Sequence, residues 1–76
     1  MKKMTVIRKV LVEIVPVCDH TKEDVKWYRN DNWELEDAIE YAKEVTYNAW
    51  VMALLYYEYY SEDGELLAEQ YIQKIV

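Results

Sequence analysis

The residues best suited to acid–base or nucleophilic chemistry lie together at Cys18-Asp19-His20. A nucleophilic site needs a base beside the nucleophile and a third group that orients the base. His20 is the only histidine of the chain, and nothing in the sequence assigns it an orienting group or a pocket. A loop histidine without a catalytic role is therefore the favoured interpretation, and we expect the protein not to be an enzyme.

The sequence contains no motif for metal or cofactor chemistry either. Carboxylates are abundant, but in an acidic chain they form pairs by chance, and no spacing makes them converge as metal ligands. Because Gly64 is the only glycine, the chain contains no glycine-rich loop that could hold a phosphate group. We expect neither a metal ion nor another cofactor.

Length and composition describe one small domain, residues 1–76, with a rich core. Apolar residues make up 53% of the chain, with eight Tyr, three Trp and no Phe. Cys18 has no partner for an internal disulfide, which fits a reducing compartment. No apolar run reaches the length of a membrane span, and charges interrupt the N-terminal stretch that a signal peptide would need. We expect a cytoplasmic protein.

The net charge of −6 is concentrated in the second half of the chain. Residues 1–33 carry a net +2 and residues 34–76 a net −8. This charge repels phosphates, so it disfavours nucleic acids and anionic membranes as direct partners and favours a basic protein surface. The acidic candidates for partner binding are Glu36, Asp37, Glu40, Glu44, Glu58, Glu62, Asp63, Glu65 and Glu69. Their spacing could imitate a row of phosphates, although a solvated face is the commoner origin of such charges.

Two strands are expected before the helix. Residues 5–17 are rich in β-branched residues and alternate as a strand with one well-buried face, which Pro16 ends. Residues 25–29 alternate as a short strand. The capping pattern Thr21-x-x-Asp24 leaves a helical turn at residues 21–30 as the alternative.

The clearest helix is predicted over residues 35–45. Its apolar residues recur at the spacing of one stripe, as Leu35, Ala38, Ile39, Ala42 and Val45. Acidic residues in the first turn complement the helix dipole. Asn32 is the expected N-cap, and Trp33 is expected to form the hydrophobic staple at the start of the helix.

Residues 49–76 are predicted to form a hairpin that turns at Asp63-Gly64. A two-residue turn would set Glu58 opposite Glu69. A three-residue turn with Gly64 in the left-handed conformation avoids this like-charge pair and is favoured. The favoured register gives the pairs Ser61 with Glu65, Tyr60 with Leu66, Glu58 with Ala68, Leu55 with Tyr71, and Leu54 with Ile72.

Both faces of this hairpin are apolar or aromatic. One is expected to carry Trp50, Met52, Leu54, Tyr56, Leu66 and Ile72, and the other Val51, Leu55, Tyr57, Tyr59, Leu67, Tyr71 and Ile75. We therefore expect an α+β fold, β(β)αββ, in which one helix packs on one face of a three- to four-stranded antiparallel sheet. One helix covers one face only. The second face is then an interface or is buried by another copy of the chain.

The segment from Trp33 to Glu44, followed by the Asp63-Gly64 hairpin, resembles small phage and mobile-element proteins, including some anti-CRISPR proteins. In these proteins a helix of this pattern packs on an antiparallel sheet. The resemblance covers roughly residues 33–66. Trp33 stands where such proteins often have Phe, and no functional residue carries over. The resemblance implies a phage-encoded inhibitor in the host-cell cytoplasm.

The function expected from these features is non-enzymatic binding. An inhibitor of the anti-CRISPR type would block a basic, nucleic-acid-binding effector, with the acidic residues steering the encounter and Trp50, Tyr57 and Tyr59 anchoring it. The alternative is a structural homo-oligomer or accessory subunit, such as a homodimer, assembled through the exposed sheet face.

Overall fold

A computed structural model of the protein describes residues 5–17, 25–47 and 49–76. The predictions for Cys18, His20 and the Thr21 cap lie outside this part of the chain. The elements in chain order are β1 (Val6–Pro16), β2 (Lys26–Arg29), α1 (Leu35–Thr46), β3 (Val51–Ser61) and β4 (Leu66–Ile75).

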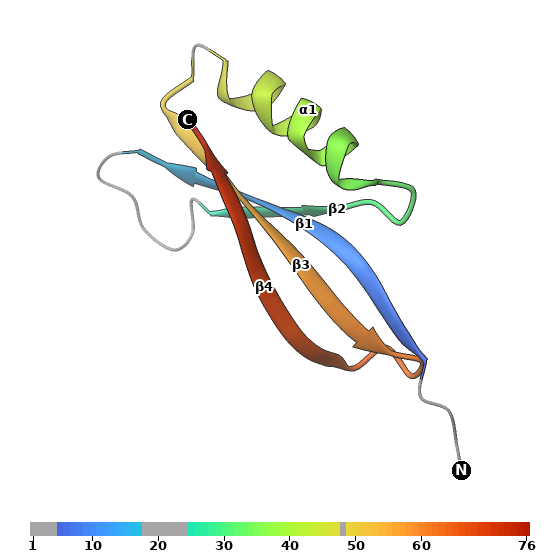
Figure 1. Ribbon diagram of the computed structural model, residues 1–76. Coiled ribbons are helices and arrows are strands. Elements are labelled where there is room, and N and C mark those ends of the chain that lie inside the picture. Colours follow the sequence, from blue (N-terminus) through green and yellow to red (C-terminus); the bar gives the residue numbers. More distant parts are fainter. Residues whose placement is uncertain (1–4, 18–24, 48) are drawn as a thin grey trace.

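The four strands form one antiparallel sheet in the order β2-β1-β3-β4, and α1 lies against one of its faces (Figure 1). This arrangement confirms the predicted α+β fold. It also decides for strand over residues 26–29, where a helical turn was the alternative.

The hydrophobic core lies between α1 and the two central strands. β1 pairs with β3 over its whole length, from Val6 opposite Ser61 to Pro16 opposite Val51. Side chains alternate between the two faces of a strand, so every second residue of these strands points toward the helix. The buried core residues are Val10, Val12, Ile14, Ala38, Ala42, Ala53 and Leu55.

The helix begins at Leu35 as predicted, but its N-cap lies two residues after the predicted one. Glu34 is the N-cap, and its backbone N–H donates to the Asp37 carboxylate at 3.0 Å. The prediction of Asn32 as the cap is wrong because Asn30 has organised the preceding turn. The Asn30 side chain accepts a hydrogen bond from the N–H of Asn32 at 2.9 Å. The backbone carbonyl of Asn30 accepts one from the N–H of Trp33 at 3.0 Å.

Two small residues form the most deeply buried part of the contact between the helix and the sheet. Ala38 and Ala42 are fully buried, so the helix backbone approaches the strands closely at these two positions. One turn later, the Thr46 hydroxyl donates to the carbonyl of Ala42 at 2.8 Å, which satisfies a buried polar group. Among the described residues, no helix is long and apolar enough to cross a membrane.

The hairpin turn agrees with the three-residue prediction. The N–H of Ser61 donates to the carbonyl of Glu65 at 2.9 Å, and the N–H of Gly64 donates to that of Ser61 at 3.0 Å. Gly64 has a φ of 87°, the left-handed conformation that glycine adopts without steric cost. The next pair, Tyr60 opposite Leu66, is also as predicted.

Beyond that pair the predicted register is wrong, because β4 contains two irregularities. Leu67 and Ile72 have no partner in β3, so the ladder shifts at each of them. The observed pairs include Tyr59 with Ala68, Glu58 with Glu69, Tyr57 with Gln70, Tyr56 with Tyr71, Leu55 with Gln73 and Leu54 with Lys74.

A shift of one residue moves a side chain to the other face of a sheet. Ile72 therefore packs against the core with Ile75, whereas Tyr71 lies beside Tyr56 on the opposite face. The predicted faces of Tyr71 and Ile72 are thus interchanged. Trp50 lies just before the start of β3, and its carbonyl accepts a hydrogen bond from the N–H of Val17 at 3.0 Å.

The helix is much shorter than the strands it covers. α1 has 12 residues and so measures about 18 Å, whereas the 11 residues of β3 extend over about 36 Å. Figure 1 shows β3 and β4 running well beyond the helix toward the hairpin turn. Ile7, Leu66 and Leu67 remain exposed there. No element of the described residues covers the face of the sheet opposite α1.

Replacing Ala42 with leucine is expected to destabilise the fold, because the larger side chain has no space between α1 and the sheet. We expect Ala42→Leu to lower the free energy of unfolding by about 1–3 kcal/mol, measured by urea denaturation. Ala68→Leu, at an exposed position of β4, is the matched control and should change it by less than about 0.5 kcal/mol. Equal effects of the two substitutions would contradict the close helix–sheet contact.

Candidate binding cleft

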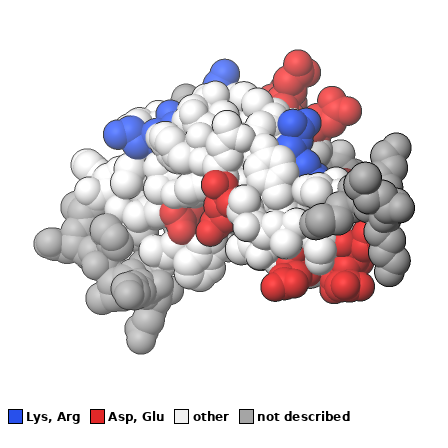
Figure 2. All heavy atoms as spheres, turned by 60° about the horizontal axis from the view of Figure 1, so that its bottom comes forward, with Lys and Arg blue, Asp and Glu red and all other residues white. Residues whose placement is uncertain are grey.

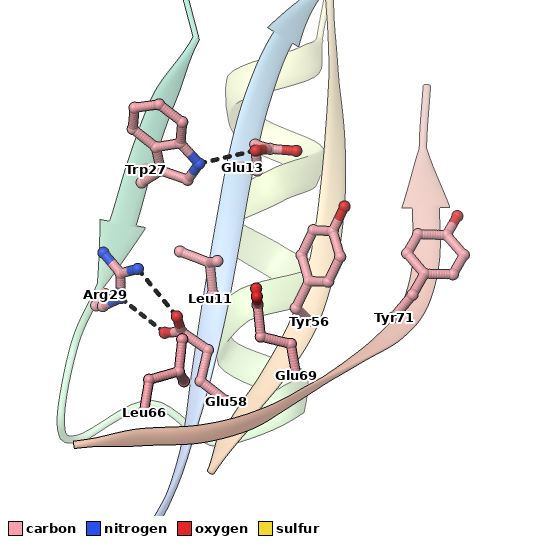
Figure 3. A pocket seen from close by; sticks show the side chains of 9 residues that line it. All are labelled: Leu11, Glu13, Trp27, Arg29, Tyr56, Glu58, Leu66, Glu69 and Tyr71. Carbon is pink, nitrogen blue, oxygen red and sulfur yellow. Dashed lines mark hydrogen bonds and ion pairs between the residues drawn. The ribbon is translucent and has the colours of Figure 1, made fainter. Parts of the chain in front are cut away.

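The face of the sheet opposite α1, called the open face, contains a cleft of about 740 Å³. All four strands contribute to it (Figure 3). Its lining residues are Leu11 and Glu13 from β1, Trp27 and Arg29 from β2, Tyr56 and Glu58 from β3, and Leu66, Glu69 and Tyr71 from β4.

Strand pairing places the cleft residues in rows across the sheet. One row runs from Arg29 through Leu11 and Tyr56 to Tyr71, each residue opposite the next in its neighbouring strand. Leu11 is the apolar floor of the cleft. It is only 3% exposed although no helix covers this face, and the longer side chains of the cleft surround it (Figure 3).

Arg29 and Glu58 join two strands that are not neighbours. Arg29 extends from β2 past β1 and pairs with Glu58 on β3 through two contacts, Nε to Oε1 at 2.7 Å and Nη2 to Oε2 at 3.0 Å. The Glu58 side chain is 2% exposed and that of Arg29 is 44% exposed. This two-contact geometry is the strong form of an arginine–carboxylate pair.

The pair shifts the pKa of both groups toward the charged forms. The hydrogen bonds from Arg29 hold the pKa of Glu58 below its ordinary value of 4.5, against the opposing effect of burial. The hydrogen bond to Glu58 likewise raises the pKa of Arg29. A carboxylate with a lowered pKa stabilises the fold above its unfolded pKa, and this stabilisation is lost as the pH falls through the folded pKa.

The rim of the cleft is aromatic and acidic. The indole N–H of Trp27 donates to a carboxylate oxygen of Glu13 at 2.7 Å. The rings of Tyr56 and Tyr71 meet edge to face at 5.6 Å between centroids. Burial raises the pKa of Tyr56, and the negative charges of Glu13 and Glu69 raise it further.

The cleft has an excess of negative charge. Its lining includes three carboxylates and one guanidinium, and that guanidinium is engaged by Glu58. Within the described part of the chain, the ion pairs are Arg29–Glu58 and Lys9–Asp31, so neither Glu13 nor Glu69 is paired with a cation. Ring faces and carboxylates both attract positive charge, so this arrangement is suited to binding a cationic group.

The structure separates the acidic candidates predicted from the sequence into three places. Those of α1 lie exposed on the helix, those of the hairpin turn lie exposed at its tip, and Glu69 lines the cleft. On the face drawn in Figure 2, the described acidic side chains form separate groups with uncharged residues between them. The helix group is Glu36, Asp37, Glu40 and Glu44, and the tip group is Glu62, Asp63 and Glu65.

The structure corrects the prediction made for Glu58. It was expected as an accessible partner-binding residue, but it is buried and paired with Arg29 inside the chain. Its carboxylate therefore serves the structure of the cleft. The predicted register did not contain the like-charge pair of Glu58 with Glu69. This pair is tolerated because Arg29 compensates Glu58.

None of the three predicted aromatic anchors lines the cleft. Tyr57 packs against the core on the helix side, with the Arg8 guanidinium 4.3 Å from its ring centroid. Tyr59 lies beside it, 6.4 Å between centroids, and its hydroxyl bonds to Gln70 at 2.9 Å. Trp50 is 80% exposed, seven residues before Tyr57.

Sequence reasoning missed most of the cleft. Glu13, Trp27, Arg29, Tyr56 and Tyr71 were not selected, because each strand was considered alone and β2 was ambiguous. One signal was present: Glu58 is the single charge in Tyr56-Tyr57-Glu58-Tyr59-Tyr60. A carboxylate in such a strand needs a cation when it is buried. The alternation of β2 places Arg29 on the face where it can supply this cation.

The described residues contain no group of three or more His, Cys, Asp or Glu side chains that could hold a metal ion. Comparison of the chain with models of protein families, with curated proteins and with solved structures finds no match.

Removing the cation of the buried pair is expected to destabilise the protein in a pH-dependent way. Arg29→Met leaves the Glu58 carboxylate without its partner. We therefore expect this substitution to lower the free energy of unfolding at pH 7 by about 1–3 kcal/mol. The difference should shrink as the pH falls toward about 4, because Glu58 loses its charge in the variant.

The measurement is urea denaturation followed by circular dichroism across this pH range. Arg8→Met removes a guanidinium that lies over one ring on the helix side and should cost less than about 1 kcal/mol at every pH. A loss for Arg29→Met that is equal at pH 7 and pH 4 would contradict the role of the pair.

Proposed function

We propose that the protein is a non-enzymatic binding protein that docks through its open face on a basic surface of a larger protein. The observation that carries this proposal is the uncovered face itself. Trp27 and Tyr71 are each 53% exposed at the rim of a cleft, on the side of the sheet that α1 does not reach. Exposed aromatic residues grouped around a hollow are typical of protein interfaces.

Charge supports a basic partner. The protein has a net charge of −6, and the cleft keeps two carboxylates without a paired cation among the described residues. Opposite charges on the two proteins would accelerate their encounter and fix their orientation. The exposed acidic groups on α1 and at the hairpin tip would add to this long-range attraction without contacting the partner directly.

The basic surfaces of nucleic-acid-binding proteins are the partners that this charge pattern fits best. By occupying such a surface, the protein would act as an inhibitor of the effector, as the resemblance to anti-CRISPR proteins implies. In this proposal the open face makes the contact, and the host-cell cytoplasm is where the two proteins meet.

Self-association through the same face is the second candidate, and it is favoured by the same exposed rings. Electrostatics opposes it. Two copies meeting cleft to cleft would bring the carboxylates Glu13 and Glu69 of one copy toward those of the other, and like charges at an interface are destabilising. A foreign basic partner replaces this repulsion with attraction.

Affinity capture tests the proposal. The immobilised protein should retain from a host-cell lysate a nucleic-acid-binding protein, identified by mass spectrometry. Retention should fall between about 0.1 M and about 1 M salt, where the Debye length decreases from about 10 Å to about 3 Å. The double variant Trp27→Ala/Tyr71→Ala should lose this partner, because it removes the exposed rings of the open face.

The matched control is Tyr47→Ala/Trp50→Ala, which removes two aromatic residues of high exposure, 78% and 80%, that do not line the cleft. It should retain the partner. Equal retention by both double variants would refute docking through the open face. A stable dimer at micromolar concentration in sedimentation, dispersed by Trp27→Ala/Tyr71→Ala, would favour the homo-oligomer instead.

A further inference from the structure

We propose that the cleft of the open face is a binding site for one arginine side chain of the partner. The guanidinium would lie between the aromatic residues of the rim and pair with Glu13 and Glu69. This inference rests on the proposed function and names the chemistry by which the open face selects its partner.

Two carboxylates are placed to receive the guanidinium. Glu13 lies on β1 and Glu69 on β4, and both line the cleft together with Tyr56 of β3 (Figure 3). Glu58 does not compete, because Arg29 already occupies both of its oxygens. A guanidinium has five N–H donors in a fixed plane, so it can serve two carboxylates at once.

The walls of the cleft are suited to a flat cation. Trp27 comes from β2 at one side, and the Tyr56–Tyr71 pair comes from β3 and β4 at the other (Figure 3). Trp27 keeps its indole N–H on Glu13, which fixes its ring at the rim. A cation over an aromatic face gains about 0.5–1 kcal/mol at an exposed site and more when it is desolvated.

Arginine fits these features better than lysine does. Its guanidinium stacks on ring faces, forms several hydrogen bonds in one plane and is more weakly hydrated than an ammonium group. The molecule already contains one such contact on its other face, where Arg8 lies over the ring of Tyr57. A cleft of about 740 Å³ is within the usual size range of binding pockets, about 300–1,000 Å³.

The test is a titration of the full ¹⁵N-labelled chain with a short peptide that carries one arginine, followed by NMR. The arginine peptide should shift the Trp27 indole N–H signal and the amide signals of Glu69 and Tyr71. The same peptide with citrulline, a neutral group of the same shape, should bind at least about tenfold more weakly, because it lacks the charge. A lysine peptide should bind with intermediate strength.

Matched variants separate the cleft from general attraction. Glu69→Gln should weaken binding of the arginine peptide at least about threefold. Glu44→Gln removes the same charge from the exposed side of α1 and should leave binding unchanged. Equal binding of the arginine and citrulline peptides, or equal weakening by the two variants, would overturn the inference.

The outcome can be distinguished from failure of the proposed function. If the peptides fail but Trp27→Ala/Tyr71→Ala still loses the captured protein, docking stands and the arginine site is wrong. If the arginine peptide binds as expected but no basic protein is captured, the arginine site stands and the proposed function is wrong.

Discussion

The ion pair between Arg29 and Glu58 is the interaction on which the open face depends. It links the edge strand β2 to the central strand β3 across β1, and it holds a charge where the alternation of β3 would otherwise place an apolar residue. Because Glu58 is compensated in this way, Glu69 can stand opposite it. That register in turn brings Tyr71 beside Tyr56 and gives the cleft its second wall.

The described residues form a single helix, which explains why the open face is available at all. One 12-residue helix shields part of one side of a sheet whose central strands have 11 residues each, and small residues at its contact let it pack closely there. The remaining apolar side chains are either sheltered by long neighbours, as Leu11 is, or left at the surface, as Trp27 and Tyr71 are. The binding surface is thus a consequence of how little helix the chain contains.

The charges of the molecule act at two ranges. Those on α1 and at the hairpin tip are solvated, separated from each other and effective mainly over distance. Those in the cleft lie beside aromatic rings, which also attract positive charge. Of its three carboxylates, one is used for stability and two remain for binding. The net charge alone does not reveal this division, since every carboxylate counts equally in it.

The sequence by itself determined β1, α1 and the hairpin of β3 and β4, because their signals are local: β-branched alternation in β1, the apolar stripe of α1, and Asp63-Gly64 at the turn, with Gly64 left-handed. It also indicated that one face would stay uncovered. Only the tertiary structure decided which residues form the cleft. Leu67 and Ile72 shift the β4 register, and Arg29 meets Glu58 from 29 positions away in the chain. Both depend on contacts between strands, and the period of a single strand carries no information about them.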